Sequence, residues 1–335
     1  MHLHEIQQRL ETLGAKPGHA ARVWRAWLGA GSLDKRHSPA ASYLPLRLRE
    51  ALPALWQDLD ALARIHTETQ GADDSTRLLL KLADGQTVES VLLPRDGLCV
   101  STQVGCAVGC RFCMTGRAGL LRQLSSGEIA AQVALARRQR TVRKVVFMGM
   151  GEPAHNIDAV LEAITWLGTH GGVGHKNLVF STVGDPRVFE RLPKETVKPA
   201  LALSLHTTNA ELRTELLPKA PRMTPEELVE AGEHYARLTG YPIQYQWTLI
   251  AGVNDSDAEL DGIVHLLSGK YAMMNFIPFN RVEGLNYQRP APERATQMAN
   301  HLRQHGIHST LRQSAGQDID GACGQLRARQ WAAEK

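Results

Sequence analysis

The stretch Leu98-Cys99-Val100-Ser101-Thr102-Gln103-Val104-Gly105-Cys106-Ala107-Val108-Gly109-Cys110-Arg111-Phe112-Cys113 contains four cysteines, and the last three, Cys106, Cys110 and Cys113, are spaced four and three residues apart. Residues 98–103 predict a strand, so these thiols follow it directly in a loop. Two glycines in the loop allow tight turns. The chain therefore presents three thiols together just after a strand.

Three neighbouring thiols indicate metal chemistry rather than packing. A structural zinc site uses four closed ligands, usually as paired Cys-x-x-Cys units. An iron–sulfur cube held by three cysteines leaves one iron open to an exogenous ligand. The spacing favours the cube, and a zinc site and inert thiols are the alternatives.

Strand-like and helix-like segments alternate beyond residue 97. The predicted strands are 98–103, 144–148, 177–182, 200–206, 243–250, 273–279 and 307–312, and the predicted helices are 127–138, 154–167, 225–238, 257–267 and 292–305. Ser125 and Glu128 form a capping-box pattern at the first of these helices. The alternation predicts an α/β fold with parallel strands, either a barrel or a doubly wound sheet.

The chain before residue 98 has a different pattern. Residues 1 to about 70 predict helices, with Trp24 and Trp27 on an apolar face that we expect in the core. Residues 76–83 and 86–93 predict two strands joined by Asp84-Gly85, a strong hairpin signal. We therefore expect helices first and then a β-hairpin.

Polar residues gather where the predicted strands end. They are residues 149–152, Ser181, residues 204–206 and Asn280. Because active sites in parallel α/β folds form at the carboxyl ends of the strands, we expect these segments at one rim.

The composition is that of an ordinary globular protein. The chain has 335 residues, 43% of them hydrophobic, and a formal net charge of +4. Five cysteines are too few, and odd in number, for a secreted disulfide scaffold. The start of the chain lacks a signal-peptide pattern, and no apolar stretch is long enough to span a membrane. We expect a cytoplasmic protein with no membrane partner.

The three-cysteine spacing resembles the signature of the radical S-adenosylmethionine (radical SAM) superfamily. This resemblance implies a [4Fe-4S] cluster on Cys106, Cys110 and Cys113 whose open iron binds S-adenosylmethionine (SAM). One-electron reduction of SAM then yields a 5′-deoxyadenosyl radical. Residues 149–153, Gly-Met-Gly-Glu-Pro, look like the segment that binds the SAM amine, although alone they would indicate only a turn.

More narrowly, the chain resembles the RlmN/Cfr-type RNA adenine methyltransferases. The matching segments are 88–91, 98–106, 149–153, 181–182, 204–206, 252–255 and 318–326. The resemblance implies a partial, TIM-like (β/α)6 barrel. We expect a helical, RNA-binding accessory domain over 1–72, a β-hairpin extension over 73–97, the barrel with a C-terminal catalytic-cysteine loop over 98–327, and a tail over 328–335.

The family's chemistry gives roles to the other two cysteines. Ring carbons C2 and C8 of adenine are electron-poor, so direct displacement on SAM cannot methylate them. By resemblance, Cys323 takes a methyl group from one SAM, and a second SAM supplies the radical that activates it. Cys99 then releases the product through a transient Cys99–Cys323 disulfide, which an external thiol reduces. Two SAM molecules are consumed per turnover.

Glu89 matches the family's proton acceptor. Strand alternation puts it on the face of Val91 and Leu93, an apolar setting that would raise the pKa of the carboxyl group towards that of a useful base. The alternative is an exposed strand glutamate.

The same resemblance implies the SAM contacts. They are Gly151, Glu152, Ser181, Ser204, Leu205, His206 and Asn280. A histidine at a strand end is more often satisfied within the fold than a ligand, so His206 is assigned only through its Ser204-Leu205-His206 context.

The resemblance implies an RNA partner, with C2 of an adenine in 23S rRNA, and also tRNA, as the expected target. Methylation at C8 and another RNA target are alternatives, the latter because Thr207 and Arg281 depart from the family pattern. A metal-stabilised RNA-binding protein and a small-molecule radical enzyme are further alternatives. The basic residues between 137 and 144 suit either RNA contact or a solvated helix end. We expect a monomer that depends on a one-electron reductant.

Overall fold

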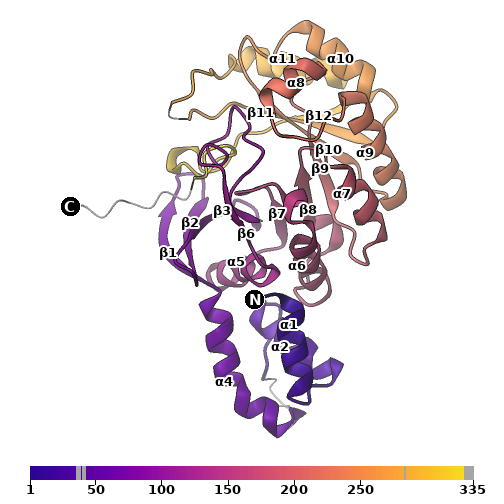
Figure 1. The fold of residues 1–335 in the computed structure, drawn as a ribbon. Coiled ribbons are helices and arrows are strands. Elements are labelled where there is room, and N and C mark those ends of the chain that lie inside the picture. The colour runs from indigo at the N-terminus through magenta and orange to yellow at the C-terminus, as the bar shows by residue number, and fades with distance from the viewer. Residues whose placement is uncertain (35–38, 40–42, 283, 328–335) are drawn as a thin grey trace, which may run out of the picture.

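Ten of the strands that the structure describes form one sheet whose order follows the chain, β1–β2–β3–β4–β7–β8–β9–β10–β11–β12. The computed structural model describes residues 1–34, 39, 43–282 and 284–327 (Figure 1). The predicted tail over 328–335 lies outside these residues. The strands are β1 (Ala63–Gln70), β2 (Thr76–Leu82), β3 (Thr87–Leu93), β4 (Gly97–Cys99), β5 (Gln103–Gly105), β6 (Leu120–Gln123), β7 (Lys144–Phe147), β8 (Leu178–Thr182), β9 (Ala200–Ser204), β10 (Ile243–Leu249), β11 (Ala272–Pro278) and β12 (His308–Leu311).

The helices connect the strands or precede them. They are α1 (Leu3–Thr12), α2 (Pro17–Trp27), α4 (Leu46–Ala61), α5 (Ser126–Gln139), α6 (Ile157–Thr169), α7 (Pro186–Arg191), α8 (Ala210–Leu216), α9 (Pro225–Thr239), α10 (Asp257–Leu267) and α11 (Pro292–Gln304). At α5 the predicted capping box forms, because Ser125 N–H donates to the Glu128 carboxylate at 2.8 Å and Glu128 N–H donates to Ser125 Oγ at 3.3 Å.

The predicted (β/α)6 barrel is confirmed. Strands β4, β7, β8, β9, β10, β11 and β12 run parallel to one another in this order. Each of the first six is followed by a helix, namely α5, α6, α7, α9, α10 and α11. A doubly wound sheet would reverse its strand order at a switch point, whereas this order is sequential, as in a barrel wall. Within the described residues β1 and β12 do not pair, so the barrel is partial.

The hairpin prediction is also confirmed, but the prediction of helix up to about residue 70 is wrong. Strands β2 and β3 pair antiparallel, and β3 continues antiparallel onto β4. Residues 63–70, predicted as helix, instead form β1, which pairs antiparallel with β2. Thr67 and Thr69 are β-branched, and pairing with the free edge of β2 outweighs the local helical pattern.

The predicted strand over 98–103 is divided in two. Strand β4 ends at Cys99, and the Thr102 and Gln103 N–H groups both donate to the Met150 carbonyl oxygen, at 2.8 and 3.2 Å. The chain thus leaves the main sheet and forms the separate hairpin β5–β6, which flanks the cysteine loop.

Two apolar clusters hold the fold together. The larger cluster joins the N-terminal helices to the barrel, from Leu3 and Trp24 through Ile129 of α5 to Phe276 of β11. The smaller one surrounds the cysteine loop and includes Val108 and Phe112. Figure 1 shows α1, α2 and α4 at one end of the molecule, below α5 and α6. Among the described helices, none is both long and apolar enough to cross a membrane.

Candidate active site

The cysteine loop closes at its base through two glycines. Gly105 has φ +81°, and a Cβ there would lie 2.1 Å from the Gly119 carbonyl oxygen, so only glycine fits. Cys106 N–H donates to the same oxygen at 3.0 Å, and Cys113 N–H donates to the Cys110 carbonyl at 3.1 Å. These bonds hold the three cysteines on one short loop.

The thiols of Cys106 and Cys110 lie in surroundings that oppose their ionisation. Cys106 is buried, and Cys110 and Cys113 are half-buried. Burial raises the pKa of Cys106 to about 12 and raises the pKa of Cys110 well above its usual range. Thiolates at this place therefore need a cationic partner, which bound metal supplies.

The spacing of the sulfur atoms bears on which metal group fits. The three sulfurs are not among the described groups whose ligand atoms all lie within 4.8 Å of one another. Thiolates around one zinc ion, with bonds of about 2.3 Å, would be about 3.8 Å apart. A four-iron cube holds its thiolates farther apart because each binds a different iron. The spacing favours the cube.

A second loop, after β7, carries Gly151 and Glu152. Gly151 has φ +106°, and a Cβ there would lie 2.6 Å from the Gln103 side chain. The Gln103 Oε1 atom accepts a hydrogen bond from Glu152 N–H at 2.7 Å. A glycine is required here by both the backbone angle and the close approach of Gln103.

The Glu152 carboxylate is buried without a counter-charge. It accepts hydrogen bonds from Ala154 N–H at 3.1 Å and Val183 N–H at 3.0 Å. Burial outweighs these bonds and raises the pKa of Glu152 to about 7. No lysine, arginine or histidine of the described chain forms an ion pair with it. An ammonium group from a ligand would supply the missing charge.

His206 follows β9 in the left-handed region, with φ +63°. Its Nδ1 accepts from Thr248 N–H at 2.9 Å, and Asn254 Nδ2 donates to its carbonyl at 2.7 Å. Burial lowers the pKa of His206 to about 3, so the imidazole is neutral and its proton is on Nε2. The Phe112 ring of the cysteine loop packs edge-on, with ring centroids 4.7 Å apart.

The other predicted SAM contacts also lie at strand ends. Ser181 and Ser204 are half-buried at the ends of β8 and β9, and the Leu205 side chain is fully buried. Asn280 follows β11, and its Nδ2 donates to Ser314 Oγ at 2.9 Å and to the Cys323 carbonyl at 3.0 Å. Its Oδ1 is buried without a partner, which leaves an acceptor for a ligand.

Cys323 lies on a loop that crosses towards the cysteine loop. Met114 N–H donates to the Gly324 carbonyl, and Thr115 Oγ1 donates to the Leu326 carbonyl, both at 2.7 Å. Cys323 is exposed, whereas Cys99 at the end of β4 is buried. Burial raises the pKa of Cys99, and the charge of a Cys323 thiolate raises it further. The two thiols therefore lie within electrostatic reach of each other.

Glu89 lies on β3 and is buried, but its setting is not the apolar one expected. Arg77 Nη1 lies 3.3 Å from its Oε1, and Arg327 N–H donates to its Oε2 at 2.8 Å. The hairpin register brings Arg77 beside it, which strand alternation alone could not show. Cys99 pairs with Val91, so Cys99 and Glu89 share one face of the sheet.

The basic run over 137–144 serves the fold. Arg137 Nη1 donates to the carbonyls of Leu28 at 2.8 Å and Gly171 at 2.6 Å. Arg138 pairs with Asp60, and Arg140 donates to the Leu93 carbonyl. Through these bonds the three arginines tie α5 to the N-terminal helices and to the hairpin.

Sequence reasoning missed three supporting residues. Gln103 orients the Glu152 loop, Asn254 fixes the His206 backbone, and Arg77 pairs with Glu89. Gln103 and Asn254 lie inside the matched segments and could have been noted there. Arg77 carries no local signal, because its role depends on strand register.

Comparison with known proteins agrees with this geometry. Residues 100–263 match the family model described as the radical SAM superfamily. The chain is 68% identical to the "Probable RNA methyltransferase" of Azoarcus sp. strain BH72, over 98% of this chain and 95% of that protein. A relative of the same description in Aromatoleum aromaticum strain EbN1 is also 68% identical, over 98% and 93%. The crystal structure of a radical SAM methyltransferase from Sphaerobacter thermophilus matches with a TM-score of 0.85 at 35% identity, covering 98% of both chains.

The chain belongs to the radical SAM superfamily. Within it, the chain is a member of the same methyltransferase family as these relatives. A radical SAM protein implies a [4Fe-4S] cluster and SAM. The residues fit both groups, because three cysteines share one short loop with sulfurs too far apart for a single zinc ion, Glu152 lacks a counter-charge and Asn280 Oδ1 lacks a donor.

Proposed function

We propose that this radical SAM methyltransferase methylates a ring carbon of adenine in RNA. The observation that carries the proposal is the placement of Cys323 beside the cysteine loop and within electrostatic reach of Cys99. A second thiol pair next to a three-cysteine loop suits a reaction in which the protein itself carries the methyl group. RNA as the substrate class is supported by the names of the relatives.

The cofactors, when bound, supply an electrophilic methyl group and a 5′-deoxyadenosyl radical, at two SAM molecules per turnover. Cys106, Cys110 and Cys113 would hold the cluster. Glu152 would take the SAM amine, with Gly151, Ser181, Ser204, Leu205, His206 and Asn280 around the rest of SAM. The neutral His206 offers a single N–H donor, since Nδ1 is occupied.

Three side chains would act on the substrate. Cys323 would accept the methyl group, and once the adenosyl radical has taken one of its hydrogen atoms, the remaining CH2 would join the adenine carbon, with one electron returned to the cluster. Glu89, paired with the Arg77 guanidinium, would accept the proton from that carbon. Cys99 would then attack the Cys323 sulfur, releasing the methylated base and leaving a disulfide for an external thiol to reduce.

We propose C2 of an adenine in 23S rRNA, and also in tRNA, as the target in the cytoplasm, with C8 methylation and another RNA target as alternatives. Such a base must leave its stack to reach a site inside a barrel, which favours loops of RNA. We further propose that the chain acts as a monomer with a one-electron reductant. Residues 1–72 would be an accessory module for RNA, ahead of the extension over 73–97 and the core over 98–327.

The proposal is tested by mass spectrometry of protein purified anaerobically with its cluster. The peptide with Cys323 should gain one CH2, and Cys106→Ala should abolish the gain. The Cys99→Ser variant should instead accumulate RNA tethered to Cys323, because the tether cannot be released. An unmodified Cys323 after reconstitution with iron, sulfide and SAM would refute the mechanism. Digestion of the RNA product then separates 2-methyladenosine from 8-methyladenosine.

A further inference from the structure

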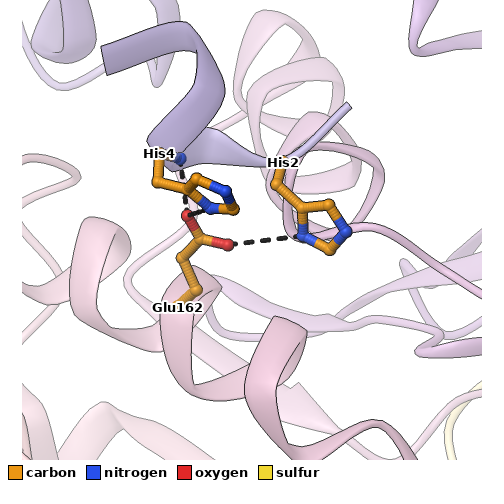
Figure 2. Close-up of side chains that lie close together, drawn as sticks. All are labelled: His2, His4 and Glu162. Carbon is orange, nitrogen blue, oxygen red and sulfur yellow. Dashed lines mark hydrogen bonds and ion pairs between the residues drawn. The ribbon is translucent and has the colours of Figure 1, made fainter. Parts of the chain in front are cut away.

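Three side chains outside the active site converge where the start of the chain meets the barrel. His2 and His4 lie at the start of α1, and Glu162 lies on α6 (Figure 2). The Nδ1 atoms of the two imidazoles lie 3.5 and 2.9 Å from the two carboxylate oxygens. Figure 2 shows both rings turned towards the same carboxylate.

The spacing of the ligand atoms suits a single metal ion. One donor atom from each of the three residues lies within 4.8 Å of the others. Nitrogen and oxygen ligands at about 2.0–2.1 Å from a tetrahedral ion are about 3.3 Å apart. The His4 Nδ1–Oε1 and His2 Nδ1–Oε2 distances of 2.9 and 3.5 Å are near that value, although they run to the two different oxygens of one carboxylate. Binding therefore requires the side chains to turn until all three donors face one ion.

The donor set indicates which ion would bind. Two imidazole nitrogens and one carboxylate suit Zn²⁺ and its neighbours in the first transition series, whereas Mg²⁺ and Ca²⁺ prefer oxygen donors. A divalent cation beside the positive end of α1 meets some repulsion. The Glu5 carboxylate, which accepts a hydrogen bond from His2 N–H, offsets it together with Glu162.

We propose that His2, His4 and Glu162 form a binding site for a divalent transition-metal ion, with Zn²⁺ as its ordinary occupant. The ion would link α1 to α6, adding to the backbone bonds from Leu3 N–H to Ser126 Oγ and from His4 N–H to Glu162. The site is separate from the cysteine loop and has no thiol. Its role is to fasten the N-terminal helix to the barrel, and it does not depend on the proposed RNA chemistry.

The test is calorimetric titration of Zn²⁺ into the whole, tag-free chain carrying Cys99→Ser and Cys323→Ser, with the iron–sulfur cluster loaded so that Cys106, Cys110 and Cys113 are occupied as well. We expect one site in this chain. Affinity should fall at least tenfold in His4→Ala and in Glu162→Gln. The glutamine variant keeps an acceptor for His4 N–H, so it separates loss of a metal ligand from loss of the helix contact. Zn²⁺ should also raise the unfolding temperature of the wild-type chain but not of Glu162→Gln.

The matched control is His305→Ala. His301 and His305 stack on α11 with ring centroids 4.4 Å apart and are the chain's other described close pair of histidine rings. Zn²⁺ binding that survives in both His4→Ala and Glu162→Gln, or that disappears in His305→Ala, would overturn the proposal. So would the absence of any Zn²⁺ binding by the wild-type chain. In either case the three residues form an ordinary helix contact only.

Discussion

Glu152 is a single carboxyl group whose ionisation opposes folding. The unfolded chain ionises it near its usual pKa of 4.5, whereas in the folded chain burial raises the pKa to about 7. A group whose pKa is raised by folding stabilises the fold below pH 4.5, and this contribution is lost as the pH rises through 7. The loss amounts to about 3 kcal/mol.

The Glu152→Gln side chain cannot ionise. We therefore expect the free energy of unfolding of this variant, measured relative to that of the wild-type chain, to increase as the pH rises. The gain between pH 5 and pH 8 should approach about 3 kcal/mol in the cluster-free protein. Urea unfolding of both chains at the two pH values measures it. A difference that stays constant with pH would show that the carboxyl group is not buried as described.

Gly151 lies at a position where the backbone angle and the Gln103 side chain leave no room for a larger residue. The substitution Gly151→Ala forces a strained backbone angle and a contact of 2.6 Å with Gln103, so the Glu152 loop must move. We expect the free energy of unfolding to fall by about 2–4 kcal/mol and the affinity for SAM to decrease, and chemical denaturation and calorimetric titration measure the two effects. Gly252→Ala is the matched control, because Gly252 has φ +69° but no atom within 4 Å of the new Cβ. Equal losses of stability in the two variants would show that the backbone angle, and not the contact with Gln103, causes the effect.

At the scale of elements, α5 links the barrel to the N-terminal helices. Its residues from Ser126 to Ala134 are all buried, and Arg137 extends the link through carbonyls from two other segments. A lysine at this position lacks the planar, forked guanidinium group and cannot bond to the Leu28 and Gly171 carbonyls in the same way. This role differs from the RNA contact that a basic run suggests.

The Arg137→Lys variant should therefore lose about 2 kcal/mol in free energy of unfolding, because buried carbonyls lose charged donors. Arg143→Ala should lose far less free energy of unfolding, because the Arg143 side chain is 78% exposed and its ion pair with Asp96, at 3.4 Å, lies in solvent. Chemical denaturation compares the two. If Arg137→Lys is as stable as the wild-type chain and only its affinity for RNA falls, then Arg137 contacts RNA and does not stabilise the fold.

At the scale of the whole molecule, the N-terminal helices and the barrel share one apolar cluster. Leu3, Ile6 and Trp24 belong to the same buried set as Ile129 and Leu161. An accessory module with its own core would unfold separately, whereas a shared core couples the two parts.

We expect one unfolding transition for the full chain. Trp24, Trp27 and Trp56 lie in α2 and α4, so tryptophan fluorescence of a variant with Trp166 and Trp247 replaced by phenylalanine reports mainly on the N-terminal helices. Far-ultraviolet circular dichroism reports mainly on the barrel helices, and the two unfolding curves should coincide. Deletion of residues 1–62 should expose the apolar faces of α5 and α6 and yield an aggregating protein. Two separate transitions, or a stable and monomeric truncated barrel, would contradict this.

The sequence by itself determined the features that depend on neighbours along the chain. Alternating apolar runs predicted the barrel strands and their helices, Asp84-Gly85 predicted the hairpin, and Ser125 with Glu128 predicted a helix start. The cysteine spacing indicated the superfamily, because three thiols on one short loop need no other segment to bring them together. The short helices α7 and α8 were not predicted, since six or seven residues give too little periodicity.

Only the tertiary structure decided which distant groups meet. Residues 63–70 become a strand because β2 offers an edge, Glu89 gains Arg77 through strand register, and Arg137 finds carbonyls on two other segments. His2 and His4 reach Glu162 only after α1 docks on α6. Such contacts are set by packing and backbone pairing between segments far apart in the chain, and no local pattern encodes them.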